Sequence, residues 1–272
     1  MKKYSRKALG QHFLTNPIIL KKITNCISPQ KRDLIIEVGA GRGSLTFLLT
    51  DKAGQVIAIE KDESLIPFLE KNKPPNLEIR NEDVLKINFN HIAVPGKTKL
   101  VGNLPYSISS QILFKLLQEH EAVEECHFML QKEVAQRVCA SSGTKKYAPI
   151  SILLQNIFSP KIQFFLSPGS FVPPPEVKSA LITLKKRKKP FYPFFLTKRF
   201  KKFIKQAFSQ RRKTLRNNLK LIGFAPEQIN KSLGACGLNT KIRAEKVSIH
   251  DFADLYLNLL KHKNETERKN MV

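Results

Sequence analysis

Short apolar runs rich in β-branched residues are spaced along the first two thirds of the chain. Each run is bounded by polar or turn residues, which is typical of strands buried in a parallel sheet. The runs are residues 33–38, 56–59, 77–79, 100–102, 162–166 and 180–184. After the first run come a glycine turn and then Leu45, Leu48 and Leu49 at helical spacing. This order predicts a doubly wound α/β domain, in which ligands bind at the carboxyl ends of the strands.

The last third of the chain has a different period. Apolar residues recur every three or four positions from Phe194 to Leu221. This spacing predicts one amphipathic helix over residues 194–221. Shorter helices are expected at 226–233 and 248–260, followed by a polar, frayed tail.

Charge follows the same division. The 272 residues carry a formal net charge of +25, from 47 Lys and Arg against 22 Asp and Glu. From Lys185 onward, 23 basic and 6 acidic residues fall within 88 positions. This excess indicates a polyanionic partner such as nucleic acid. The basic run that ends at Pro190 marks the boundary. We expect an α/β domain with a basic N-terminal arm over 1–185, a basic, all-α domain that binds nucleic acid over 190–262 and a polar tail over 263–272.

A glycine-rich loop, residues 39–44, follows the first expected strand. Glycines there allow the backbone to approach a ligand closely. A dinucleotide fingerprint needs Gly or Ala at the position of Ser44, so the loop, with Glu37 just before it, favours S-adenosylmethionine over a nicotinamide cofactor. The alternative, that Glu37 only caps a helix or pairs locally, stays open. Glu60 ends the second strand, where its carboxylate can accept hydrogen bonds from both hydroxyls of a ribose.

Two residues after the third expected strand suit an adenine ring. Asp83 can accept a hydrogen bond from the adenine amine, and Val84 can cover the ring. Alone, Asp83 is an ordinary loop acid. In series with Gly39, Glu60 and Asn103, each after a successive strand, it is expected to bind ligand.

The tetrapeptide Asn103-Leu104-Pro105-Tyr106 follows the fourth run. The Asn103 amide oxygen and the Leu104 carbonyl are two acceptors, which can receive both hydrogens of an exocyclic amine. Tyr106 can stack on the flat ring that carries the amine. This arrangement aims the nitrogen lone pair at an electrophile and suits methylation of adenine. The alternative is an ordinary turn, since Asn and Pro are common in turns.

A second signature, residues 171–179, holds three consecutive prolines, Pro173 to Pro175. Prolines fix an extended loop and lower the entropy lost when the loop is ordered. Phe171 at its start is expected to stack on a flipped base. A buried core position is the alternative for this ring.

A dense group of cations lies within the expected helix 194–221. Arg211, Arg212, Lys213 and Arg216 fall close together without acidic neighbours. Such a run is often only a solvated face, but here we expect contacts with RNA phosphates, which make binding steeply dependent on salt.

Several of these segments together resemble the ribosomal RNA adenine dimethyltransferase family, in its bacterial small-subunit type. The segments are residues 9–14, 37–43, Glu60, 82–84, 103–106 and 171–179. The resemblance runs from about Lys7 to the last helices. It implies a Rossmann-like S-adenosylmethionine methyltransferase domain with a mixed seven-stranded sheet. It also implies dimethylation of two adjacent adenosines in the 3′-terminal hairpin loop of small-subunit (16S) ribosomal RNA, in the pre-30S particle.

The resemblance also implies roles for single residues. His12 and Leu14 would close over the cofactor, Gly39 would approach its methionine portion, and Gly41 would also bind the cofactor. Glu60 would bind its ribose. The other roles are adenine binding by Asp83 and Val84, target-amine binding by Asn103 and the Leu104 carbonyl, and a sandwich of the target base between Tyr106 and Phe171. The family usually has Asn at the position of His12, so either the His12 side chain or only its backbone would contact the cofactor.

Three other functions are compatible with some of these features. A related dimethyltransferase acts on large-subunit RNA and confers antibiotic resistance. An assembly factor would act mainly by binding, and a DNA adenine methyltransferase would share the amine-binding motif. The basic helical domain and residues 171–179 favour the small-subunit RNA enzyme.

Other features are negative. The four cysteines show no metal-site or disulfide spacing, so reduced thiols in a cytoplasmic protein and no metal are expected. No run is long and apolar enough to cross a membrane, and the start of the chain lacks a signal-peptide core. Nothing indicates an obligate dimer, so a monomer is expected.

Overall fold

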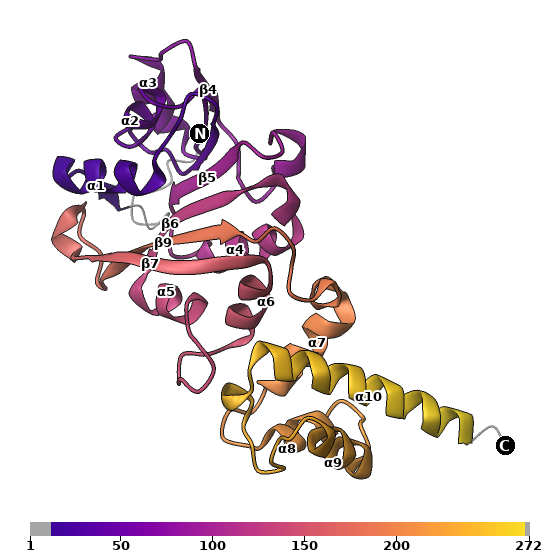
Figure 1. The fold of residues 1–272 in the computed structure, drawn as a ribbon. Coiled ribbons are helices and arrows are strands. Elements are labelled where there is room, and N and C mark those ends of the chain that lie inside the picture. Colours follow the sequence, from indigo (N-terminus) through magenta and orange to yellow (C-terminus); the bar gives the residue numbers. More distant parts are fainter. Residues whose placement is uncertain (1–11, 270–272) are drawn as a thin grey trace. The chain divides into compact units, whose positions relative to one another are not determined.

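The computed structural model describes residues 12–269, with side chains through Lys261. The basic arm expected at residues 1–7 lies outside the described residues. The chain divides into two compact units (Figure 1). One unit contains the described residues up to Ala135 together with Phe158–Arg187, and the other contains Gln136–Ile157 together with the described residues from Lys188 onward.

The first unit is built on a seven-stranded mixed sheet, as expected. Its order is β4-β3-β2-β5-β6-β9-β7, and β9 is antiparallel to both of its neighbours. Figure 1 shows β5, β6, β9 and β7 side by side. The strands are β2 (Leu34–Val38), β3 (Gln55–Ile59), β4 (Leu77–Arg80), β5 (Thr98–Asn103), β6 (Glu125–Gln131), β7 (Phe158–Leu166) and β9 (Ser179–Lys186). A separate antiparallel pair joins β1 (Phe13–Leu14) to β8 (Phe171–Val172).

The register of the parallel strands aligns their carboxyl ends. Val38 at the end of β2 pairs with Ile59 of β3 and with Gly102 of β5. Ile59 in turn pairs with Arg80, the last residue of β4. The loops after four strands therefore begin along one edge of the sheet.

Three helices bury apolar residues against one face of this sheet. They are α1 (Pro17–Ile27), α2 (Thr46–Thr50) and α3 (Ile66–Glu70). Ile23, Leu49 and Leu69 are fully buried there with Ile35 of β2 and Val101 of β5. Asn16 caps α1, because its side chain accepts from the backbone N–H of Ile18 and Ile19, and Pro17 fits the first turn.

The intervening residues of the same strands point to the opposite face. Ile36, Leu100 and Phe128 are fully buried, as are Ile112 and Leu116 of α4 (Ser109–Gln118). A sheet buried on both faces explains why the strands appear in the sequence as continuous apolar runs.

The second unit is helical. Phe195 stacks on Phe200 at a ring-centroid distance of 3.8 Å, and Tyr256 packs edge-on against Phe200. The helix α5 (Lys132–Val138) crosses the division, and only its last three residues, 136–138, belong to this unit. The other helices of the unit are α6 (Pro149–Ile157), α7 (Lys198–Ala207), α8 (Leu215–Lys220), α9 (Pro226–Ala235) and α10 (Ile249–Lys269).

Two expectations about these helices are wrong. The single helix over 194–221 is broken into α7 and α8, because Asn218 Nδ2 donates to the Ala207 and Gln210 carbonyls and Thr214 Oγ1 accepts from Asn217 N. Side-chain bonds of this kind end one helix and begin the next. The last helix, expected to end at 260, continues to Lys269.

The units also differ from the expected domain division at one segment. Residues 136–157, placed by sequence in the α/β domain, group with the C-terminal helices. Asn156 accounts for part of this grouping, since its side chain bonds both the N–H and the carbonyl of Tyr192. None of the described helices is long and apolar enough to cross a membrane.

Candidate functional site

Two adjoining hollows lie at the carboxyl edge of the parallel strands. The first is lined by residues from the segment before β1, the glycine loop and the tetrapeptide after β5, and the second by the loops after β3, β4 and β5. They share Gly39, Glu60 and Pro105. The residues expected at the site that line one or both hollows are His12, Leu14, Glu37, Gly39, Gly41, Glu60, Asp83, Val84, Asn103, Leu104 and Tyr106.

The glycine loop lines both hollows, since Gly39 borders each of them and Gly41 borders the first. Gly39 and Gly41 have φ values of +73° and +61°, a region that side chains disfavour. Gly39 N donates to Ile59 O at 2.8 Å, which fixes the loop to the neighbouring strand. A Cβ at Gly41 would lie 3.1 Å from the Phe13 ring. The loop therefore presents bare backbone to the site.

Glu37 supplies a buried carboxylate in the first hollow. It is 2% exposed, and its Oε2 atom has no hydrogen-bond partner among the described residues. Loss of solvation raises the pKa of Glu37 to about 8, and repulsion from Glu60 adds to the rise. A buried carboxylate oxygen without a hydrogen-bond partner is costly, so Glu37 Oε2 is suited to a ligand that brings a cation or a donor.

Glu60 holds the loop in place. Its Oε2 accepts from Gly41 N at 2.8 Å and its Oε1 from Asp62 N at 2.9 Å. Burial raises the pKa of Glu60, although the Asp62 and Gly41 amides oppose the shift. Each carboxylate oxygen has two lone pairs, so Glu60 keeps acceptor capacity toward the hollows.

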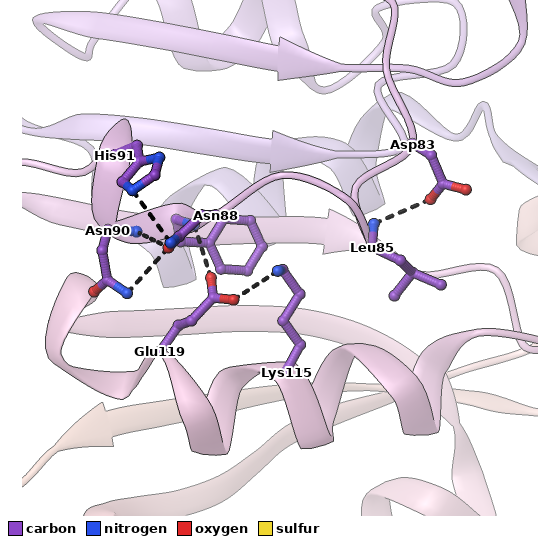
Figure 2. Close-up of polar contacts among 8 residues, drawn as sticks. Asp83, Leu85, Asn88, Asn90, His91, Lys115 and Glu119 are labelled. Carbon is purple, nitrogen blue, oxygen red and sulfur yellow. Dashed lines mark hydrogen bonds and ion pairs between the residues drawn. The ribbon is translucent and has the colours of Figure 1, made fainter.

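Asp83 and Val84 line the second hollow. Asp83 pairs with Lys61 at 2.9 Å, and this hydrogen bond lowers the pKa of Asp83. Its other oxygen accepts from Leu85 N at 3.0 Å (Figure 2). The carboxylate is thus ionised and an acceptor, as binding of an amine requires.

The loop that follows Asp83 is anchored on α4. Figure 2 shows the Glu119 carboxylate between this loop and Lys115. Glu119 accepts from Phe89 N at 2.7 Å and pairs with Lys115 at 2.7 Å. The Phe89 ring is fully buried. These contacts limit the movement of the wall that carries Asp83.

Asn103 and Tyr106 have fixed orientations. Asn103 Nδ2 donates to His12 O at 2.6 Å. Neither Asn103 Oδ1 nor the Leu104 carbonyl accepts a hydrogen bond from the part of the chain that the structure describes. The Tyr106 hydroxyl lies 2.6 Å from Ser179 Oγ. Burial raises the pKa of Tyr106, although this bond opposes the shift. Two acceptors and an aromatic ring therefore stand side by side at the first hollow.

Phe171 is not placed as expected for a stacking residue. Its ring is 2% exposed and packs in the core with Leu14 and Leu20, which themselves line the first hollow. The reason is the pairing of Leu14 with Phe171, which turns this side chain inward and leaves Val172 58% exposed. Of the two rings expected to sandwich a base, only Tyr106 lines the hollow.

Some lining residues carried no role in the sequence interpretation. Phe13 and Arg42 both line the first hollow. The Arg42 guanidinium lies 5.4 Å from the Phe13 ring and 5.1 Å from the Phe68 ring. Ser179 was named only as the end of a signature. Its contact with Tyr106 depends on β9 returning beside β6, which local patterns do not reveal.

The expected phosphate-binding cations occupy the α7–α8 loop and α8 of the second unit. Arg211 donates to the carbonyl of Lys145, and Arg216 Nε donates to Asn230 Oδ1 at 2.7 Å. Arg212 and Lys213 are exposed, and no hydrogen bond or ion pair within the described residues involves their side chains.

The chain is similar to known proteins over nearly its whole length. The family model described as "Ribosomal RNA adenine dimethylase" matches residues 2–261. A Xylella fastidiosa protein named "Ribosomal RNA small subunit methyltransferase A" is 40% identical over 255 residues, covering 92% of this chain and 94% of its own. A protein of the same name from Clostridium acetobutylicum is 40% identical over 252 residues, covering 92% and 91%.

Two solved structures are similar to this chain over most of its length. A dimethyladenosine transferase from Plasmodium falciparum superposes with a TM-score of 0.76 at 26% identity, covering 92% of this chain and 98% of that one. The 23S rRNA methyltransferase ErmE has a TM-score of 0.71 at 23% identity, covering 91% and 99%, and shares the fold.

We predict that Phe171→Ala lowers the free energy of unfolding by about 3–5 kcal/mol, because it leaves a cavity in the core. Phe171→Leu, which keeps most of the volume, is expected to cost less than about 1.5 kcal/mol. Urea unfolding monitored by circular dichroism measures both. An Ala variant as stable as the wild type would contradict the buried position of the ring.

Glu37 gives the ligand-free protein a pH-dependent stability. Its pKa is about 8 when folded and about 4.3 when unfolded, so the folded state binds more protons between these values. Stability from this group is fully present below the unfolded pKa and is lost as the pH rises toward 8, by at most about 1.4 kcal/mol per pH unit. Glu37→Gln should flatten the profile in urea titrations at pH 5.5, 6.5 and 7.5 (roughly spanning the window). Parallel profiles for the two proteins would contradict this assignment.

Proposed function

Because this chain belongs to the ribosomal RNA adenine dimethylase family, we propose that it transfers methyl groups from S-adenosylmethionine to the N6 amines of adenosines in small-subunit ribosomal RNA. The observation that carries the proposal is the pair of acceptors, Asn103 Oδ1 and the Leu104 carbonyl, beside a hollow lined by Glu37, whose buried Oε2 atom has no hydrogen-bond partner among the described residues.

The residues at the hollows fit S-adenosylmethionine. Glu37 offers a carboxylate to a cationic ligand, and Gly39 offers backbone without a side chain. Glu60 suits the ribose hydroxyls, and the ionised Asp83 suits the adenine amine. When bound, S-adenosylmethionine supplies an electrophilic methyl group on a sulfonium.

The acceptor side is formed by the tetrapeptide. Asn103 Oδ1 and the Leu104 carbonyl each accept one hydrogen of the adenine amine, which directs its lone pair away from the protein acceptors. Positive charge that develops on the amine is stabilised by the same two oxygens, which are already oriented. Tyr106 stacks on the base, and stacking of about 1–3 kcal/mol per base helps to hold it outside its helix.

For a second transfer to the same nitrogen, the amine has only one hydrogen left to donate to the two acceptors. The monomethylated amine donates to one of the two acceptors, and the first methyl group takes the place beside the other. No general base is assigned, because the proton passes to solvent after transfer. The product at each site is N6,N6-dimethyladenosine.

The RNA target is proposed at a finer level from the family resemblance. We propose that the targets are two adjacent adenosines in the 3′-terminal hairpin loop, modified within a pre-30S particle. We also propose that the enzyme acts as a monomer in the cytoplasm. Arg212 and Lys213, which are exposed and whose side chains form no hydrogen bond or ion pair with the described residues, are proposed to bind phosphates together with Arg211 and Arg216. Such contacts position RNA without reading its sequence, so the base is selected at the tetrapeptide.

The proposal is tested with labelled S-adenosylmethionine and small ribosomal subunits that lack the modification. We expect label in two adjacent dimethyladenosines near the 3′ end of the small-subunit RNA, mapped by mass spectrometry. Label found only in large-subunit RNA would instead assign the enzyme to the resistance type. If cofactor binds but no label enters RNA, the protein is an assembly factor that acts by binding.

Asn103→Ala is expected to lower the single-turnover rate of methyl transfer by about 100-fold or more, since it removes one oriented acceptor. Affinity for S-adenosylmethionine, measured by calorimetry, should change much less. Asn90→Ala removes an amide from an exposed position outside the hollows and serves as the control with wild-type rate. A large loss of cofactor affinity in Asn103→Ala would move this residue to the cofactor site.

A further inference from the structure

His12 makes two hydrogen bonds that point in different directions. Its backbone carbonyl accepts from Asn103 Nδ2 at 2.6 Å, and its ring Nδ1 lies 2.8 Å from the Pro173 carbonyl oxygen. A proline carbonyl can only accept, so Nδ1 carries the proton of this bond. One residue therefore links the end of β5 to the proline-rich loop after β8, although 161 positions of sequence separate His12 from Pro173.

The backbone bond determines which way the Asn103 amide faces. The amide NH2 must point to the His12 carbonyl, because the opposite orientation would place two oxygens together. Oδ1 is then left as the acceptor at the hollow. If the amide were reversed, it would present donors to an adenine amine that is itself a donor.

The hydrogen bond from the His12 ring to Pro173 also holds the segment around His12, because it lies next to the pairing of β1 with β8. Phe13 pairs with Val172 and Leu14 with Phe171, so the Pro173 bond extends this short two-stranded ladder by one contact. A ladder of two residues is weak alone. The His12 ring also lies 5.6 Å from the Tyr106 ring.

We infer that His12 is a positioning residue for the adenine that receives the methyl group. The hydrogen bond from its ring to Pro173 holds the segment that contains the His12 carbonyl, and this carbonyl orients Asn103. This inference rests on the proposed function, because its consequence is measured in methyl transfer. The His12 ring therefore forms a hydrogen bond within the protein, and the neighbouring residues of the hollow bind the cofactor. What the position requires is an N–H donor on the atom next to Cγ. Asn satisfies this requirement through Nδ2, whereas Leu has a similar volume and no donor.

The test compares His12→Leu with His12→Asn in the full-length protein. With saturating small subunits and S-adenosylmethionine, the Leu variant should lose about tenfold in kcat, as expected for one lost hydrogen bond. Its dissociation constant for S-adenosylmethionine should stay within about threefold of wild type, whereas a direct cofactor hydrogen bond would be worth more. The Asn variant should regain most of the lost rate.

A second readout does not depend on activity. Hydrogen exchange of peptides that contain Phe13–Leu14 and Phe171–Val172 should be faster in His12→Leu than in the wild type, and close to wild type in His12→Asn. The inference fails if Asn is no better than Leu, if the Leu variant keeps the wild-type kcat, or if its main loss is in cofactor affinity. A wild-type protein that transfers no methyl group would overturn the proposed function instead, and the exchange data would still decide whether the ring holds this segment.

Discussion

Parallel pairing of β2 with β3 and β5 is the constraint on which the site depends. It aligns the ends of three strands, so that the residues immediately after or at those ends become neighbours in space. Gly39, Glu60 and Asn103 are far apart in the sequence and meet only because of this register. A shift of one residue in any strand would turn its side chains to the other face of the sheet. Burial of both faces makes such a shift costly.

Electrostatics at this edge are set by burial more than by charge pairing. Glu37 and Glu60 both have raised pKa values, mainly because they are withdrawn from water. Asp83 is more exposed and has a lowered pKa because Lys61 bonds it. The adjoining hollows therefore contain carboxyl groups whose pKa values are shifted in opposite directions. In the proposed function, a cationic methyl donor with an attached nucleoside uses both kinds, since its positive end and its adenine amine need different partners.

In the proposed function, the binding of RNA is separated from the chemistry. The helical unit carries exposed cations such as Arg212 and Lys213, whereas the methyltransferase unit has the hollows and the oriented acceptors. Phosphate contacts are insensitive to sequence, so the enzyme must select its adenosines through the shape of the RNA and the fit of one base beside Asn103 and Tyr106.

Much of the catalytic site was determined by local sequence. The glycine loop, the acids after successive strands and the tetrapeptide at Asn103 are each recognisable because their chemistry depends on residue type and on position relative to a strand. Most of the sheet was predictable for a similar reason, since strands buried on both faces leave continuous apolar runs. The residues of β6 were not among the predicted runs, and the count of seven strands came only from the family resemblance.

What the sequence left open was decided by contacts between distant segments. Asn218 ends α7 where the apolar period continues, and this bond joins residues that periodicity cannot relate. Phe171 is buried because β8 pairs with β1, and His12 turns its ring to Pro173 because the same pairing brings them together. The sequence alone determined which groups are candidates for the chemistry of this protein. Only the tertiary structure decided which of them face the ligand and which hold the others in place, because burial and hydrogen-bond partners depend on neighbours that are remote along the chain.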